Sequence, residues 1–133
     1  MGLIYLDTNA LIYAMESTGP LGQRARALLQ ANTSSDFAIS PLVKLECLVM
    51  PIRTGDRILE RKYDAWFPDF VQLSITEEAY ARAADVRARF NLKTPDALHL
   101  ACAQYHRCEA LWTNDDRLQH ASHGLAVNVF AGA

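Results

Sequence analysis

Residues 3–9, which read Leu-Ile-Tyr-Leu-Asp-Thr-Asn, constrain the fold of this chain more than any other stretch. The apolar run is short and does not alternate, as is typical of a strand buried on both faces at the centre of a parallel sheet. Asp7 falls where this strand ends, because Thr8 and Asn9 favour caps and turns. A carboxylate at the carboxyl end of a central strand lies where open α/β sheets bind ligands. Capping of the next helix is the alternative role for Asp7.

Strand and helix patterns alternate along the rest of the chain, which predicts an α/β fold with a mostly parallel central sheet flanked by helices. The 133 residues contain no linker or repeat, so we expect a single domain over residues 1–133. Further strands are predicted at residues 36–39, 71–75, 110–113 and 126–130. Helices are predicted at residues 9–15, 23–31, 41–50 (closed by Pro51 and Gly55), 56–67, 77–90 (with Thr76 as N-cap) and 95–105 (with Thr94 as N-cap), with a short helix before the last strand and a polar loop at 32–35.

The composition is that of an ordinary globular protein, with 50% hydrophobic and 21% charged residues. No apolar run approaches the roughly 18 residues needed to span a bilayer, so no membrane association is expected. The first residues lack the basic flank of a secretory signal, which predicts a cytoplasmic location. Three cysteines, an odd number without a C-x-x-C spacing, indicate reduced thiols in the interior.

Three further acids occupy positions comparable to that of Asp7. Glu46 lies on the apolar face of the third predicted helix, where burial is costly unless the carboxylate finds a partner such as a cation. A solvated glutamate at the rim of that face is the alternative. Asp96 falls in the first turn of its helix, and Asp115 follows a buried strand. If the parallel sheet aligns the strand ends, the four carboxylates converge at its carboxyl edge.

Four converging carboxylates repel one another strongly, and a divalent cation makes them compatible. Oxygen ligands without His or Cys point to Mg²⁺ or Mn²⁺. Such a cluster suits phosphodiester hydrolysis, in which metal ions activate water and stabilise the leaving oxygen. The net charge is −2, and setting aside the four clustered negative charges leaves +2 on the rest of the chain. The net charge therefore does not exclude a nucleic-acid substrate.

Four motifs in order carry a family resemblance. They are Leu-Asp-Thr-Asn at residues 6–9, the helical Glu46, Thr-Pro-Asp-Ala-Leu-His-Leu-Ala at residues 94–101, and Trp-Thr-Asn-Asp at residues 112–115. Together they resemble the PIN-domain nucleases over residues 4–130, and the small size resembles the VapC-type toxins of toxin–antitoxin pairs. The resemblance implies a catalytic and metal-ligating set that consists of Asp7, Glu46, Asp96 and Asp115. It places supporting polar residues at Thr8 or Asn9 and at Thr113.

The resemblance also implies an activity and partners. We expect a Mg²⁺-dependent (or Mn²⁺-dependent) endoribonuclease, which in this family is usually dimeric and neutralised by a cognate antitoxin protein. The candidates for an RNA-contacting rim are the basic residues Arg53, Arg57, Arg61, Lys62 and Lys93. Solvated helix faces are an equally good interpretation of these five positions.

Other functions fit the acids less well. A phosphatase of the haloacid dehalogenase kind requires a second Asp two residues after the first, where this chain has Asn9. A response-regulator receiver domain requires a late Lys after a strand, and no Lys follows Lys93. A catalytically inactive PIN-like binding module is the remaining alternative, and the intact acidic set favours the enzyme.

The sequence also separates Asp115 from the adjacent Asp116. The family-like motif assigns the ligand role to Asp115, and successive residues at a helix entry diverge by about 100° in direction. Asp116 is therefore expected to be a surface acid in the first turn of the following helix. His99, between two leucines, is expected to have a packing or capping role and not to bind a metal.

Overall fold

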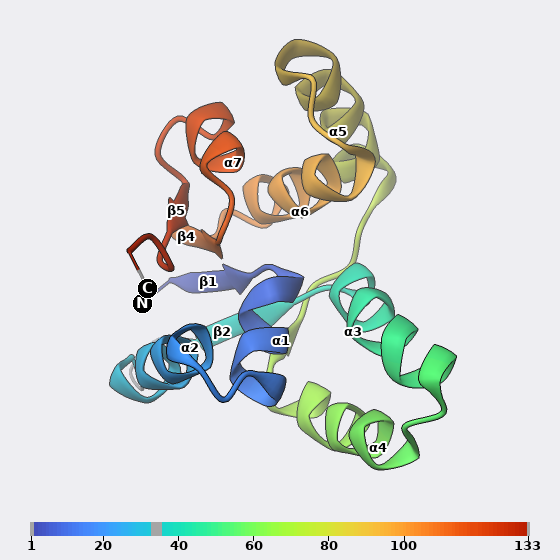
Figure 1. The fold of residues 1–133 in the computed structure, drawn as a ribbon. Helices are drawn as coiled ribbons and strands as arrows, with labels where there is room; N and C mark the ends of the chain where they lie inside the picture. The colour runs from blue at the N-terminus through green and yellow to red at the C-terminus, as the bar shows by residue number, and fades with distance from the viewer. Residues whose placement is uncertain (1, 33–35, 133) are drawn as a thin grey trace.

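Five parallel strands form the sheet at the centre of the computed structural model, which describes residues 2–32 and 36–132 (Figure 1). The strands are β1 (Leu3–Leu6), β2 (Asp36–Ile39), β3 (Val71–Gln72), β4 (Ala110–Thr113) and β5 (Ala126–Asn128). They lie in the order β3-β2-β1-β4-β5, and every pairing is parallel. The predicted α/β fold with a parallel sheet is therefore confirmed, with β1 in the middle. Most of the predicted 32–35 loop falls on residues 33–35, outside the described residues.

Helices cover both faces of the sheet. Figure 1 shows α1 (Thr8–Glu16), α2 (Pro20–Ala31), α3 (Pro41–Thr54) and α4 (Arg57–Trp66) on one face, and α5 (Glu77–Phe90), α6 (Thr94–Tyr105) and α7 (Asp116–Ala121) on the other. A 3₁₀ turn, Phe67–Asp69, precedes β3. Crossovers change face where the chain passes from β3 to β4, as right-handed connections require for this strand order. The carboxyl ends of β1 and β4 therefore meet at the point where the strand order reverses.

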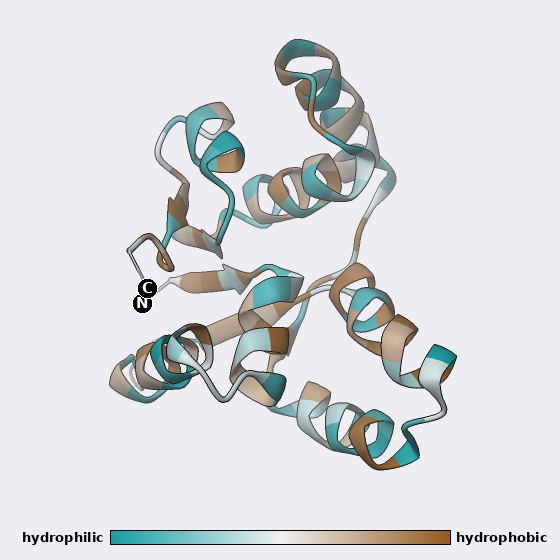
Figure 2. Ribbon diagram, in the orientation of Figure 1, coloured by the Kyte–Doolittle hydropathy of each residue, from teal (hydrophilic) through white to brown (hydrophobic). Residues whose placement is uncertain are grey.

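Apolar side chains from both layers bury the central strands. The ribbon in Figure 2 is brown, the colour of hydrophobic residues, along parts of the strands and of the helices that flank them. The largest fully buried apolar residues include Leu6, Leu11, Ile39, Leu100 and Leu111. Cys47, Cys102 and Cys108 are also buried and form no disulfide. Within the described ranges, no helix has both the length and the apolarity that crossing a bilayer requires.

Several predicted helix boundaries were wrong. Helix α2 begins at Pro20, three residues before the predicted start at residue 23, because Gly19 is its N-cap and a proline fits the first helical turn. Helices α1 and α4 differ from their predicted ranges by one residue at each end.

Helix α3 continues through Pro51 to Thr54, because a proline removes only one helical hydrogen bond and Pro51 is buried against the core. The helix ends at Gly55, whose positive φ of 72° allows the Asp56 N–H to reach back to the Pro51 carbonyl at 2.9 Å. Helix α6 begins at Thr94, one residue before the predicted start, and Lys93 is its N-cap.

The two edge strands are shorter than predicted. Strand β3 ends at Gln72, although the Leu73 N–H still donates to the Ile39 carbonyl at 2.9 Å before the chain turns into α5. Strand β5 ends at Asn128, whose Oδ1 accepts a hydrogen bond from the Phe130 N–H at 3.0 Å. The neighbouring strands β2 and β4 end at Ile39 and Thr113, which accept the last bonds from Leu73 and Val129, so the ladders cannot extend further.

Candidate active site

A cavity of about 230 Å³ opens at the carboxyl end of β1. Three of the four predicted acids line it, each from a different segment: Asp7 from the end of β1, Glu46 from α3 and Asp96 from α6. Its other lining residues are Thr8, Asn9, Ile12 and His99. The parallel sheet therefore brings together side chains that are 39 and 50 positions apart in the sequence.

Asp7 is only 6% exposed and is the N-cap of α1. Its Oδ1 accepts a hydrogen bond from the Ala10 N–H at 3.2 Å, so the capping role also considered for this residue is present. Burial raises the pKa of Asp7, and hydrogen bonds from Thr113 and Ala10 only partly oppose that shift. An ionised Asp7 therefore needs further positive charge nearby.

Glu46 faces the cavity with its side chain 29% exposed. Its Oε1 accepts a hydrogen bond from the Thr8 hydroxyl at 2.6 Å and lies 2.7 Å from Nε2 of His99. Burial tends to raise the pKa of Glu46, but the bonds from His99 and Thr8 outweigh it and leave the pKa below its usual value. The partner that the sequence analysis required for this carboxylate is thus present within the protein.

Asp96 lies in the first turn of α6, as predicted. Burial raises its pKa, and the negative charge of Asp115 raises it further. The carboxylates of Asp7 and Asp96 also repel each other, and the negative charge of Asp96 is one cause of the raised pKa of Asp7. These two acids are the part of the site that a bound cation would stabilise most.

Asp115 and Asp116 point to different partners. Asp115 is the N-cap of α7 and accepts hydrogen bonds from the Arg117 N–H at 2.8 Å and from the Arg117 guanidinium at 3.0 Å. The guanidinium holds the pKa of Asp115 below its usual range. Asp116 accepts a hydrogen bond from Nδ2 of Asn128 at 2.8 Å. Asp115 acts electrostatically on Asp96 but is not among the residues that line the cavity.

The predicted supporting polar residues have separate roles. Thr8 bonds Glu46, whereas Asn9 donates from Nδ2 to Oδ1 of Asn114 at 3.1 Å. Thr113 is fully buried, and its hydroxyl accepts a hydrogen bond from the Asp115 N–H at 3.1 Å. The Thr113 side chain also lowers the pKa of Asp7, so it favours the ionised form of the carboxylate at the end of β1.

His99 and Tyr5 were missed as site residues by the sequence analysis. His99 is 3% exposed and lies between Glu46 and the Tyr5 hydroxyl, which is 2.7 Å from its Nδ1. The available signal was spacing: His99 follows Asp96 by three positions, which places both on one face of α6. No comparable pattern marked Tyr5, which reads as an ordinary residue of a buried strand.

The predicted basic rim does not line the acidic cavity. Arg57 and Arg61 border a separate hollow of about 440 Å³ at the corner between α3 and α4, and Arg53 lies in the last turn of α3. Lys93 is exposed at the start of α6, three positions before Asp96. All five basic residues of the predicted rim are exposed to solvent.

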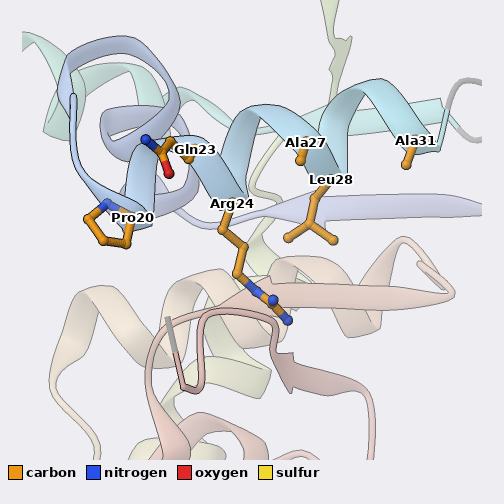
Figure 3. Close-up of a pocket in the computed structure, with 6 residues that line it drawn as sticks. All are labelled: Pro20, Gln23, Arg24, Ala27, Leu28 and Ala31. Carbon is orange, nitrogen blue, oxygen red and sulfur yellow. The ribbon is translucent and has the colours of Figure 1, made fainter.

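A larger hollow, of about 510 Å³, lies along α2 and has a different character (Figure 3). Its lining residues are Pro20, Gln23, Arg24, Ala27, Leu28 and Ala31, with no carboxylate among them. Figure 3 shows the Arg24 side chain extending from α2 towards the last segments of the chain, where Nε donates to the Val129 carbonyl. Size alone therefore does not identify the chemical site in this protein.

The acidic cavity offers oxygen ligands to a cation. Among the described residues, no group of three or more His, Cys, Asp or Glu side chains already stands close enough to hold a metal ion. Mg²⁺ commonly binds through one or two carboxylates, its own waters and substrate phosphates, and so needs no complete protein cage. Both ring nitrogens of His99 are engaged by hydrogen bonds, which leaves carboxylates as the available donors. This donor set fits a hard divalent cation that keeps part of its water shell.

Solved structures share this architecture. A toxin–antitoxin complex from Klebsiella pneumoniae contains a chain with 27% identity and a TM-score of 0.78, with 96% of this chain and 98% of that chain covered. FitAcB from Neisseria gonorrhoeae has 20% identity and a TM-score of 0.80, with 96% and 99% covered. VapC20 of Mycobacterium tuberculosis, described as a Sarcin-Ricin loop cleaving toxin, has 15% identity and a TM-score of 0.75, with 89% and 94% covered. At these lower identities, the last two likenesses show the fold alone.

The sequence itself matches a family model. No curated protein matches the chain. The model of the PIN domain, however, matches residues 4–124, which include Asp7, Glu46, Asp96 and Asp115. This match confirms the resemblance expected from the four motifs. The chain belongs to the PIN domain family.

Proposed function

We propose that this PIN domain is a Mg²⁺-dependent or Mn²⁺-dependent endoribonuclease. The observation that carries the proposal is the convergence of Asp7, Glu46 and Asp96 on one cavity where the strand order of the sheet reverses. A divalent cation bound there would activate water and stabilise the charge that develops on a scissile phosphate. The family membership and the carboxylate chemistry support the same reaction class.

The acids have distinct proposed roles. Asp7 and Asp96, whose pKa values are raised by burial, would bind the cation and be stabilised by it. Glu46, whose ionised form is favoured by hydrogen bonds from Thr8 and His99, would provide a further carboxylate oxygen to the cation. Asp115 adds negative charge near Asp96 and is the fourth proposed ligand. Thr113 lowers the pKa of Asp7 and so would favour its ionised, cation-binding form.

We further propose that the chain is the toxin of a toxin–antitoxin pair, acts in the cytoplasm and forms a homodimer. The Klebsiella complex supports an antitoxin partner, as do the VapBC complexes of Rickettsia felis and Salmonella typhimurium that share the fold. Exposed apolar side chains on α3 and α4 support a protein partner as well, because surfaces of this kind usually mark interaction sites. They include Leu45, Met50, Ile52 and Ile58, which are 59%, 54%, 60% and 71% exposed.

The basic rim remains a proposal for RNA contacts. Arg53, Arg57, Arg61, Lys62 and Lys93 are all exposed and available to phosphates. Each lost phosphate contact lowers the salt slope of single-strand binding by about 0.7. An Arg57→Glu/Arg61→Glu variant should therefore bind RNA more weakly and with a shallower salt dependence. Unchanged affinity and slope would move the RNA-binding surface elsewhere.

The decisive experiment compares cleavage of a labelled RNA and of DNA of the same sequence, in Mg²⁺, Mn²⁺ and EDTA. Wild-type protein should cut RNA only with a divalent cation, and Asp7→Asn should lose this activity while remaining folded. Asp56→Asn is the matched control, because Asp56 is also a helix N-cap but lies outside the cavity. Cleavage in EDTA, or full activity of Asp7→Asn, would contradict the proposal. RNA binding without cleavage by the wild type would support the inactive-module alternative instead.

A further inference from the structure

A line of buried polar side chains runs from the interior of the sheet to the acidic cavity. Ser40 Oγ lies 2.8 Å from the Tyr5 hydroxyl, which lies 2.7 Å from Nδ1 of His99. Nε2 of His99 lies 2.7 Å from Oε1 of Glu46. Tyr5 and Ser40 are fully buried and His99 is 3% exposed, so the line is shielded from water up to Glu46. Four elements contribute to it, because Tyr5 is in β1, Ser40 follows β2, Glu46 is in α3 and His99 is in α6.

The hydrogen-bond directions follow from what each group can donate. An ionised carboxylate only accepts hydrogen bonds, so Nε2 of His99 carries a proton and donates a hydrogen bond to Glu46. The Thr8 hydroxyl donates to the same oxygen, Oε1. Among the described residues, no hydrogen bond reaches Oε2, so the second oxygen of Glu46 is the one available to a ligand in the cavity.

We propose that His99 is a positioning residue for Glu46, and that Tyr5 and Ser40 hold the His99 ring in the orientation this requires. The side chain of Glu46 has several rotatable bonds. Hydrogen bonds from Thr8 and His99 hold Oε1 in place, so Oε2 has fewer possible positions when a cation binds. His99 does not itself bind the cation, because Tyr5 engages one ring nitrogen and Glu46 the other. The inference rests on the proposed function in one respect, that Glu46 is a metal ligand.

Packing alone does not account for this arrangement. A phenylalanine and a leucine would fill similar space at positions 5 and 99 without any buried polar atoms. Polar groups in an interior stabilise it only when they are fully paired, so a paired line of this kind constrains side-chain orientation more than it adds stability. The line also ends at a residue of the cavity and not at another core side chain. Partners of metal-ligating side chains commonly contribute about 10-fold to 100-fold in metal affinity or activity.

Mn²⁺ affinity, measured by isothermal titration calorimetry on the folded protein, tests the proposal without relying on activity. His99→Leu should weaken Mn²⁺ binding by about 10-fold to 100-fold. His99→Gln, whose side-chain amide can still donate to Glu46, should recover most of that loss. Tyr5→Phe, which removes only the hydroxyl, should weaken binding less than His99→Leu does. His106→Gln is the control, since His106 is the C-cap of α6, bonds the Ser74 carbonyl and does not line the cavity.

The outcomes separate this inference from the proposed function. If His99→Leu and Tyr5→Phe bind Mn²⁺ as tightly as the wild type, and only their melting temperatures fall, the line is structural and the proposal is overturned. If His99→Leu does not fold, His99→Gln and Tyr5→Phe decide: a Tyr5→Phe variant with wild-type affinity overturns the proposal. If the wild type itself binds no Mn²⁺, the proposed function fails first and the role assigned to His99 fails with it.

Discussion

Asp7→Asn should make the metal-free protein more stable while removing most of its stabilisation by metal. In EDTA the variant loses a buried negative charge but keeps its cap, because Asn caps helices about as well as Asp. The pKa of Asp7 is raised, so the folded state binds this proton more tightly than the unfolded state does. Ionisation of Asp7 therefore reduces stability as the pH rises above the ordinary carboxyl range. The advantage of the variant should be absent in acid and grow towards neutral pH.

The expected size of the metal effect follows from linkage. At a concentration 100 times its Kd, a ligand stabilises the folded state by about 2.7 kcal/mol. For a chain of 133 residues, this free energy corresponds to a rise of about 10 °C in melting temperature. If Asn weakens binding 100-fold, the same Mn²⁺ concentration equals the new Kd and adds only about 0.4 kcal/mol, or 1–2 °C.

Thermal unfolding followed by circular dichroism, in EDTA and in Mn²⁺ at several pH values, measures both effects. Asp56→Asn should match the wild type in every condition, because this exposed N-cap is remote from the cavity. An Asp7→Asn variant that is less stable than the wild type in EDTA at neutral pH would refute the electrostatic argument. An undiminished Mn²⁺ shift in that variant would refute the ligand role of Asp7.

Three further outcomes are expected. Asp115→Asn should reduce metal-dependent RNA cleavage by orders of magnitude and Asp116→Asn only slightly; equal effects in a cleavage assay would contradict the assignment to Asp115. Gly22→Ala should lower stability by about 1–3 kcal/mol, or about 4–11 °C in melting temperature, because its Cβ would lie 2.0 Å from the Ser17 carbonyl oxygen; an unchanged melting curve would show that α2 shifts freely. Burial raises the pKa of the Cys47 and Cys102 thiols to about 12 and that of the Cys108 thiol to about 11. Native protein should therefore react with a thiol reagent only on unfolding, and rapid modification of the native protein would show that the buried sites open readily.

The sequence predicted that four carboxylates converge, and Asp7, Glu46 and Asp96 do line one cavity, whereas Asp115 does not. Strand ends and helix starts leave strong local signals, and a parallel sheet places such points at one edge. The burial of Glu46 on an apolar face was a second signal, since a carboxylate there requires a partner. The sequence did not reveal that Thr8 and His99 are the partners, because hydrogen bonds between distant elements depend on how helices pack.

The remaining differences have similar physical causes. Pro51 normally predicts a helix end, but tertiary packing stabilises α3 beyond it until Gly55 reverses the chain. The ion pair between Asp115 and Arg117 depends on side-chain rotamers in a single turn, which residue spacing does not determine. The order of the motifs therefore identified the candidate acids. The contacts that set their protonation depend on the three-dimensional packing, which the motifs do not determine.

The central position of β1 has a consequence for synthesis on the ribosome. β1 is synthesised before the other strands of the sheet, and its edge towards β4 cannot be paired until β4, which begins at Ala110, has been made. Until then a nascent chain exposes an apolar strand edge, the kind of surface that promotes misassociation. The acids of the cavity also leave the ribosome at different times, since Asp7 and Glu46 emerge long before Asp96. A growing chain therefore cannot assemble the complete acidic cavity until α6, which carries Asp96, has been made.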